Sequence, residues 1–522
     1  MLLGHLLRSG VLGAGVALWS AVPVIAATTD GVEIVVHADR PGAVISRNIF
    51  GQFAEHLGFG IYGGIWVGED SNIPNTKGYR NDVVAALRRL EVPVVRWPGG
   101  CFADEYHWRE GIGPRDQRPV RVNTHWGGVE ETNAFGTHEF LDFAELIGAD
   151  AYVSGNVGDG SPEEMATWVE YMTSDTQSTL ANERRANGRD QPWKLPYFGV
   201  GNELWGCGGN MRAEYAADLY RRYQTFVKSP RQQRINKVAA GANGDDYHWT
   251  DVFMREAREQ MDAVSMHHYT ISGTWAEKGS ATDFDEAAWI EILSRTLRMD
   301  ELIRRHSAIM DKYDPEKRVA LFVDEWGTWY SPLPDSNPGF LQQQNSLRDA
   351  LVAAINLNIF QQHAQRVKMA NIAQMVNVLQ AMILTDNERM VLTPTYHVFD
   401  MYKPFKEAIH LPLEIATPDY SFGKFTVPAV HASAARGADN RIHLALANLD
   451  PNHSTKVRIK LVGTVARSAS GRLLTAPAIN TINTFDQPDA VRPVDFKGAT
   501  LRGDELTLNL PSKSVVVIEL RP

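Results

Sequence analysis

The sequence predicts an α/β fold in which a parallel (β/α)₈ barrel is followed by a C-terminal β-sandwich of the jelly-roll type. From about residue 48 to 408, short apolar segments alternate with amphipathic helical segments. After about residue 408, short alternating strands are separated by Gly, Pro, Asn and Asp. Alternating strands and helices are typical of a parallel sheet, whereas regularly spaced short strands are typical of a sandwich.

The barrel strands are expected at 49–55, 94–97, 150–157, within 197–205, 237–243, 263–269, within 318–327 and 369–378. Helices are expected at 82–90, 138–147, 162–172, 211–227, 251–261, 287–310, 347–365 and 396–406. Strands of the sandwich are expected at 425–427, 442–446, 456–461 and 514–520. A doubly wound open sheet is the rival fold, but no glycine-rich phosphate loop follows the first strand.

The predicted domains are a signal peptide at 1–26, an N-terminal strand segment at 27–47 that joins the β-sandwich, a catalytic barrel at 48–408 and the sandwich at 409–522. Arg8 precedes the apolar run Val11–Ala21, and small residues follow near Ala26. This pattern predicts cleavage and export to the periplasm or the extracellular space, with an uncleaved anchor as the alternative. No later run approaches the ~18 apolar residues of a membrane span, so no membrane partner is expected.

The formal net charge of the 522 residues is −10, which argues against nucleic acid as a partner. No cofactor is expected, and no metal site: the neighbouring residues His267 and His268 point to opposite sides of a strand. The two cysteines, Cys101 and Cys207, both follow predicted strand ends. They either pair or line a pocket as free thiols, and the sequence leaves both alternatives open.

Glu203 and Glu325 are the candidate catalytic residues. Each follows an apolar strand of the predicted barrel, where the active site of such a barrel lies. A retaining glycosidase needs one carboxyl group as proton donor and another as nucleophile. For either residue alone a solvated carboxylate is a reasonable alternative, but two at strand ends four and seven favour sugar cleavage.

Other polar residues at strand ends are candidates for substrate binding. Asn202 precedes Glu203, and His267 and Tyr269 lie on one face of the sixth strand. Arg96 ends the second strand, where it would keep a neighbouring carboxylate ionised, and Glu55 ends the first. The alternatives are a core histidine for His267, a structural ion pair for Arg96 and a capping group for Glu55.

Several motifs together resemble glycoside hydrolase family 51, the α-L-arabinofuranosidases. Gly201–Met211 is similar to the acid/base motif of that family, and Asp324–Tyr330 resembles its nucleophile motif. Further similar segments are Phe50–Gly58, Arg96–Phe102 with Tyr106–Trp108, Asn123–Gly128 and Val376–Gln380. The match runs from about residue 48 to 408.

The resemblance implies a retaining, exo-acting enzyme that removes terminal α-L-arabinofuranosyl groups from arabinoxylan, arabinan or their oligosaccharides. It implies Glu203 as acid/base and Glu325 as nucleophile. It implies an arabinose subsite lined by Glu55, Arg96, Cys101, Asn202, His267, Tyr269 and Gln380. It also implies a homo-oligomer, a hexamer or a trimer of dimers. The alternatives are an endo-β-1,4-glucanase or β-xylosidase on the same barrel, and a non-catalytic carbohydrate-binding protein.

Overall fold

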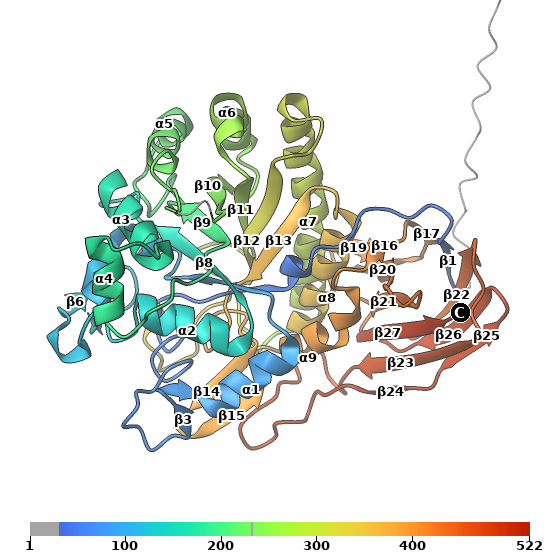
Figure 1. Cartoon of the computed structure of the whole chain (residues 1–522). Helices are drawn as coiled ribbons and strands as arrows, with labels where there is room; N and C mark the ends of the chain where they lie inside the picture. The colour runs from blue at the N-terminus through green and yellow to red at the C-terminus, as the bar shows by residue number, and fades with distance from the viewer. Residues whose placement is uncertain (1–30, 231–232) are drawn as a thin grey trace, which may run out of the picture.

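The structure is a computed structural model that describes residues 31–230 and 233–522. Within these residues, eight parallel strands close into a barrel (Figure 1). Around the barrel they are β2 (Gly51–Phe53), β5 (Val94–Trp97), β8 (Asp150–Gly155), β9 (Tyr197–Val200), β10 (Asn236–Asn243), β11 (Ala263–Thr270), β12 (Ala320–Thr328) and β13 (Val367–Ile372). β13 pairs with β2 to close the ring. The predicted (β/α)₈ barrel is confirmed.

Apolar side chains fill the barrel near the beginnings of its strands. One buried cluster contains Val94, Tyr152, Val238, Phe322 and Met369, each from a different strand. Strands covered on both faces are expected to be almost continuously apolar, as these are. The polar residues therefore collect at the opposite, C-terminal ends of the strands.

The helices lie outside the barrel and begin where the sequence supplies caps. Ser161, for example, accepts a hydrogen bond from Glu164 N, and Pro162 occupies the first turn. The helices are α1 (Asn81–Leu90), α2 (Thr137–Ile147), α3 (Pro162–Thr173), α4 (Thr179–Ala186), α5 (Ala213–Gln224), α6 (Tyr247–Ala257), α7 (Glu286–Tyr313), α8 (Leu347–Gln362) and α9 (Pro394–Met401). Helix α4 was not predicted, because its largely polar sequence has little helical periodicity.

Two sheets form the predicted sandwich. One contains β17 (Leu413–Ala416), β1 (Val32–His37), β22 (Thr455–Val462), β26 (Glu505–Leu510) and β25 (Ala499–Arg502). The other contains β16 (Ile409–His410), β20 (Val430–Arg436), β21 (Ile442–Asn448), β27 (Ser514–Arg521), β23 (Ser468–Leu474) and β24 (Val494–Phe496). Alternate residues of each sheet, such as Val457, Ile459 and Leu461, fill the core between them.

In the part of the chain that the structure describes, four two-stranded hairpins lie outside the barrel and the two sheets of the sandwich. They are β3 (Asn75–Thr76) with β4 (Tyr79–Arg80), β6 (Arg121–Val122) with β7 (Glu130–Glu131), β14 (Ile383–Asp386) with β15 (Arg389–Leu392), and β18 (Asp419–Phe422) with β19 (Phe425–Pro428). The β6–β7 hairpin brings a loop with Trp126 to the C-terminal end of the barrel, where Trp126 donates to Glu55.

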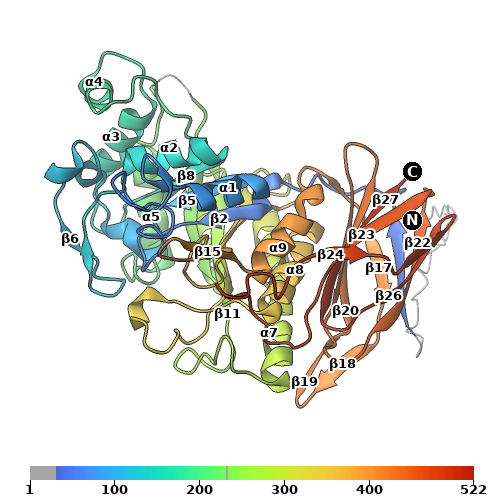
Figure 2. The ribbon, with the colours of Figure 1, turned by 90° about the horizontal axis from the view of Figure 1, so that it is seen from below.

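Helix α8 joins the barrel to the sandwich (Figure 2). It is buried from Leu347 to Gln361, and its sequence is mostly uncharged on every side. A helix that is apolar all round is one that is covered all round. One side of α8 faces the barrel and another faces the six-stranded sheet, so apolar residues of both domains belong to one continuous core.

The N-terminal strand β1 pairs with β17 and β22 of the sandwich. The domain boundaries at 27–47, 48–408 and 409–522 stay predictions. The signal peptide predicted at 1–26 lies outside the described residues. Across residues 31–230 and 233–522, no helix combines the length and hydropathy needed to cross a membrane.

Candidate active site

Glu203 and Glu325 meet at the C-terminal end of the barrel. Glu325 lies within β12, beside its cross-strand partner His267 of β11. Glu203 follows β9 through Gly201, whose φ of +81° suits glycine, and Glu203 itself has a φ of +42°. Positive φ is uncommon for other residues and concentrates at functional sites. One oxygen of each carboxyl group and a His267 nitrogen lie within 4.8 Å of one another.

Glu325 is held as an anion. Arg96 Nη1 donates to its Oε1 over 2.8 Å, and Tyr269 OH donates to its Oε2 over 2.6 Å. Burial by itself would raise the pKa of Glu325. The positive charges of His267 and Arg96 and the Tyr269 hydrogen bond outweigh burial, so the pKa lies below its ordinary value. Glu325 is therefore ready to act as a nucleophile.

Glu203 has the opposite electrostatic environment. Its side chain is 17% exposed, against 6% for Glu325, and its Oε1 lies 2.9 Å from His267 Nδ1. Burial first, and then the negative charge of Glu325, raise the pKa of Glu203 above its ordinary value. Two neighbouring carboxyl groups whose pKa values are pushed apart are suited to separate acid and nucleophile roles.

Asn202 is fixed by two neighbours. Its Oδ1 accepts from Arg96 Nη2 over 2.6 Å, and its backbone N–H donates to Asp104 over 2.8 Å. The other oxygen of Asp104 accepts from the N–H groups of Val157 and Gly158. Asp104 thus ties together the ends of β8 and β9, and burial raises its pKa to about 7.

Glu55 lies buried on the floor of the site. Its Oε1 accepts from Trp126 Nε1 over 2.9 Å and from the N–H groups of Gly100 and Phe102, and its Oε2 accepts from Gln374 Nε2 over 3.1 Å. Burial first, and then the charge of Glu325, raise the pKa of Glu55 to about 7.

Of the two glutamines after β13, Gln374 lies in the cavity. Gln380 is fully buried, and its amide is used by Thr328 N, the carbonyl of Asp349 and Thr395 Oγ1. Its predicted contact with arabinose stays a prediction. The residue pattern gave no reason to prefer Gln374.

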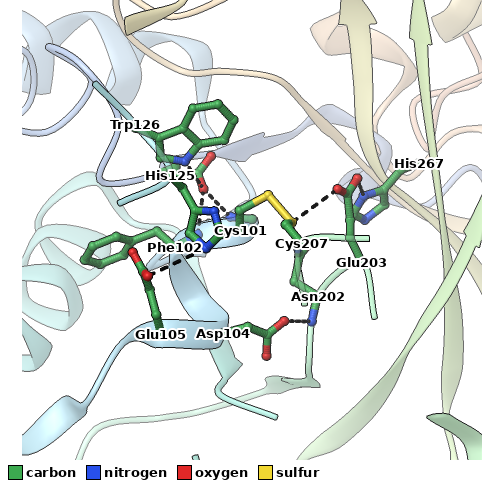
Figure 3. The surroundings of a disulfide bond; sticks show 12 residues. Cys101, Phe102, Asp104, Glu105, His125, Trp126, Asn202, Glu203, Cys207 and His267 are labelled. Atoms are coloured by element: carbon green, nitrogen blue, oxygen red, sulfur yellow. Dashed lines mark hydrogen bonds and ion pairs between the residues drawn. A yellow bond between two sulfur atoms is a disulfide. The ribbon is translucent and has the colours of Figure 1, made fainter. Parts of the chain in front are cut away.

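Cys101 and Cys207 form a disulfide, which resolves the alternative that the sequence left open (Figure 3). It joins the turn after β5 to the turn after Glu203. Cys207 Sγ lies 3.6 Å from Glu203 Oε2 and 3.9 Å from Asn202 Nδ2. Because a disulfide sulfur carries no hydrogen, its contact with Glu203 is packing only, and the bridge forms one wall of the site.

Two cavities meet at the carboxyl pair. A small one of about 70 Å³ is lined by residues that include Glu55, Cys101, Trp126, Glu325 and Gln374. A larger one of about 600 Å³ is lined by residues that include Trp205, His267, Trp275 and Trp329. Glu203, Tyr269 and Trp329 border both. A narrow pocket and a wider space therefore share a border at the carboxyl pair.

The structure thus gathers Glu55, Arg96, Cys101, Asn202, Glu203, His267, Tyr269 and Glu325 around one centre. Sequence reasoning missed Asp104, Trp275 and Gln374 and left the role of Trp126 open. Trp126 and Trp275 lie on long loops, where no periodicity points to their direction. Asp104 follows Cys101 closely, and only its buried contacts distinguish it from a surface aspartate.

Two family models match the chain. The Alpha-L-arabinofuranosidase 1 domain matches residues 86–287, and the Alpha-L-arabinofuranosidase C-terminal domain matches residues 324–514. A protein of Bacteroides ovatus named an intracellular exo-alpha-L-arabinofuranosidase is 52% identical, over 94% of this chain and 95% of its own. Alpha-L-arabinofuranosidase C of Emericella nidulans is 31% identical, over 82% and 86%.

Solved structures give the same result. The family 51 arabinofuranosidase of Xanthomonas axonopodis pv. citri is 66% identical, with a TM-score of 0.93, over 94% of this chain and 100% of that one. The arabinose complex of the Thermotoga maritima α-L-arabinofuranosidase is 30% identical, with a TM-score of 0.82, over 94% and 99%. A bifunctional glucanase-xylanase, CelM2, is 15% identical with a TM-score of 0.61, a likeness that shows the fold alone.

The prediction of export to the periplasm or the extracellular space is wrong. It is contradicted by the Bacteroides ovatus relative, which is named an intracellular enzyme. The prediction depended on composition alone: one arginine, a short apolar run and small residues near Ala26. Such a pattern carries less weight than a relative that matches almost the whole chain.

The alternative of a glucanase or xylosidase is not favoured, since the Bacteroides ovatus, Emericella nidulans and Xanthomonas axonopodis proteins, each at least 30% identical over most of this chain, are named arabinofuranosidases. Both domains, the carboxyl pair and its surroundings agree with that assignment. The chain belongs to glycoside hydrolase family 51 and is an α-L-arabinofuranosidase.

Proposed function

We propose that the chain removes terminal α-L-arabinofuranosyl residues from the side chains of arabinoxylan, arabinan or their oligosaccharides, with Glu325 as nucleophile and Glu203 as acid/base. The contrast between the two carboxyl groups carries this proposal. Arg96, Tyr269 and His267 stabilise Glu325 as an anion, whereas burial beside that anion favours the protonated form of Glu203.

In the first step Glu325 attacks the anomeric carbon while Glu203 protonates the leaving oxygen. The bond from Glu325 to the sugar forms as the glycosidic bond breaks. Arg96 and Tyr269 position the attacking carboxylate through hydrogen bonds to its two oxygens. The separation of the carboxyl oxygens, within 4.8 Å, supports retention, because inverting enzymes keep their carboxyl groups about 6.5–9.5 Å apart.

In the second step Glu203 acts as a base. It takes a proton from the water that attacks the glycosyl-enzyme bond, so that arabinose leaves and Glu325 becomes a free carboxylate again. His267, which lies within reach of both carboxyl groups, positions Glu203 in each of its two charge states.

The small cavity supports removal of one sugar at a time. It is about 70 Å³, and the hydrogen-bonded groups of Glu55, Trp126 and Gln374 line it. Glu55 and Gln374 supply polar groups for the hydroxyls of one ring. A site that holds a single terminal sugar gives exo action.

The larger cavity supports a polymeric or oligomeric leaving group. It is about 600 Å³, and its tryptophans Trp205, Trp275 and Trp329 offer flat faces for pyranose rings. Trp275 and Trp329 contact each other edge to face at 5.5 Å, and Trp329 likewise contacts Tyr269 at 5.0 Å. This aromatic row leads outward from the nucleophile, along the path that a polymer backbone would take.

The test combines a substrate panel with product stereochemistry. Nitrophenyl α-L-arabinofuranoside, β-D-xyloside and β-D-glucoside are compared, with arabinoxylan, arabinan and carboxymethyl-cellulose. Arabinose is expected from the first substrate and both arabinose polymers, first appearing as the α-anomer in time-resolved NMR. Initial release of the β-anomer, or faster cleavage of cellulose, would contradict the proposal. The homo-oligomer stays a prediction that light scattering can check.

A further inference from the structure

If the disulfide beside Glu203 is reduced, Cys101, Cys207 and Glu203 supply ligands of the kinds that bind metal ions. We propose that reduction of Cys101–Cys207 creates a site for a thiophilic divalent cation, Zn²⁺ above all, that uses both sulfurs and the carboxylate of Glu203. An ion bound there inhibits the enzyme. The site is inhibitory, and the proposed reaction needs no metal.

The three side chains already lie in the right place. One ligand atom each of Cys101, Glu203 and Cys207 lies within 4.8 Å of the others. Zinc binds thiolate sulfur at about 2.3 Å and carboxylate oxygen at about 2.0–2.2 Å. In the disulfide the two sulfurs are bonded to each other and leave no room for an ion between them. Once that bond is broken, the sulfurs separate and open this edge of the site.

A fourth ligand is also within reach. His267 Nδ1 lies 2.9 Å from the Oε1 of Glu203, and the groups of Glu203, His267 and Glu325 form a second potential ligand set that shares Glu203. Two sulfurs, one carboxylate oxygen and one imidazole nitrogen or water are a tetrahedral zinc set. Glu203 borders the larger cavity, so an ion from solvent can reach it.

The choice of metal follows from the ligands. Thiolates select zinc and other soft cations, whereas magnesium and calcium need mostly oxygen ligands. Mg²⁺ is therefore not expected to bind here. Asn202 Nδ2, 3.9 Å from Cys207 Sγ, lies where it donates to a thiolate and stabilises its charge.

The chemistry balances with an added reductant. A water-soluble phosphine cleaves the sulfur–sulfur bond, takes an oxygen atom from water to become a phosphine oxide, and leaves two thiols. Zinc then displaces the two thiol protons together with the proton of Glu203, and these protons appear in solution. Thiols of this kind stay reduced where glutathione and thioredoxin act, the conditions of a cytosol.

The predicted inhibition by zinc rests on the proposed acid/base role of Glu203, whereas the predicted binding of zinc does not. A carboxylate coordinated to zinc holds no proton and has no free lone pair directed at the leaving oxygen. Both the protonation of the leaving group and the activation of water therefore stop. Direct binding measurements separate the two parts.

The experiment compares the oxidised chain with the chain treated with phosphine and then desalted without air. Each is titrated with Zn²⁺, and bound zinc is counted by elemental analysis. One zinc per reduced chain is expected, with loss of arabinoxylan hydrolysis at the same concentration and recovery with EDTA. Co²⁺ in place of Zn²⁺ is expected to give the intense sulfur-to-metal absorption band of a thiolate site. The oxidised chain is expected to show none of these effects.

Variants assign the ligands, with inhibition expressed against the activity of each variant. Cys207→Ser is expected to weaken zinc binding by more than the roughly 10–100-fold that loss of an outer hydrogen-bond partner costs. Glu203→Ala is also expected to weaken zinc binding, and this is measured by direct titration rather than by inhibition. Asp245→Asn is the matched control, because Asp245 lines the larger cavity beside His268 and is not among the proposed ligands. Its zinc affinity is expected to stay unchanged.

Several results would overturn the proposal. These are equal zinc binding by the oxidised and reduced chains, unchanged affinity in Cys207→Ser or Glu203→Ala, and a reduced chain that unfolds by circular dichroism. Zinc bound by all three ligands without inhibition would refute the inhibitory part. Failure of the proposed catalytic role is a separate result, because it would appear as full activity of Glu203→Ala without any metal.

Discussion

Arg96 donates to Glu325 over 2.8 Å, and both side chains are almost fully buried, 2% and 6% exposed. The second arm of the same guanidinium donates to Asn202, the residue before Glu203 in the sequence. A planar group with several donors holds both in fixed geometry, which a single ammonium group does not reproduce.

Arg96→Lys is therefore expected to lower kcat by about 10²–10³-fold, the range found when one preorganised donor is removed from a transition state. The weaker hold on the Glu325 carboxylate should also raise its pKa, so the acid limb of kcat/KM should move to higher pH. Arg118→Lys is the control, because Arg118 forms a comparably buried pair with Glu139 over 3.1 Å outside both cavities. An unchanged pH profile in Arg96→Lys would contradict the role given to Arg96.

Glu203→Ala is expected to slow hydrolysis of arabinoxylan by about 10²–10⁴-fold, the usual contribution of a general acid. Substrates with an acidic phenol as leaving group need no proton in the first step. The rate at which the variant forms the glycosyl-enzyme from them should therefore stay close to that of wild type. The pKa of Glu203 is raised, so the wild-type kcat/KM falls as pH rises through that pKa, and the variant should lose this alkaline limb. Glu325→Ala should be inactive on every substrate. Equal losses for good and poor leaving groups would contradict the acid role.

Glu55→Gln is expected to lower activity and to raise the free energy of unfolding at high pH. Because the folded-state pKa of Glu55 is about 7, the native state binds more protons than the unfolded chain between about pH 4.5 and 7. Wild-type stability therefore falls as pH rises through that window, by the order of 1–3 kcal/mol. The neutral amide removes this loss, so the variant should be stabilised at pH 8 and little changed at pH 4.5.

Denaturant unfolding of wild type and Glu55→Gln at the two pH values measures this difference. The Oε1 of Gln374 has no hydrogen-bond partner among the described residues, so its amide can turn to accept from the new glutamine. Activity should fall, because the variant lacks the carboxyl group that we propose as a partner for the sugar hydroxyls. A pH-independent difference in stability would contradict the raised pKa.

Trp275→Ala is expected to separate long substrates from short ones. Trp275 is 56% exposed at the outer end of the aromatic row. Loss of one stacked ring, worth about 0.5–1.5 kcal/mol, should raise KM for arabinoxylan oligosaccharides about two- to tenfold. KM for nitrophenyl arabinofuranoside should not change, because one nitrophenyl ring is expected to reach Trp329 but not Trp275. Phe422→Ala, an exposed aromatic of the β18–β19 hairpin at 41% exposure, is the control.

The barrel was predictable because its strands and helices carry different periodicities over many residues. The closeness of Glu203 and Glu325 was predictable because both glutamates follow apolar strands of the barrel. The glutamine that lines the small cavity was not predictable. Strand β13 ends at Ile372, and the chain then runs irregularly through Asn377 and Leu379, both at positive φ. Neither strand nor helix periodicity applies there, so Gln374 and Gln380 cannot be distinguished from the pattern.

Side chains on loops escaped prediction for the same reason. Trp126 reaches Glu55 across 71 positions of sequence, and this contact depends on how the β6–β7 hairpin folds back over the barrel. The pairing of Cys101 with Cys207 depends equally on the closeness of two turns 106 residues apart. Composition gives the residue types, but only the tertiary fold brings them together.

Strand β1 is synthesised long before the strands β17 and β22 with which it pairs. His37 contacts Glu414, which is synthesised 377 residues later. At about 5–20 residues per second, the first strand waits roughly 20–75 s for its partners. The barrel strands emerge during that interval, so the barrel can assemble while β1 still lacks its sheet. A nascent chain stalled before β22 would expose the apolar face of β1, formed by Val32, Ile34 and Val36, and a chaperone would have to cover it.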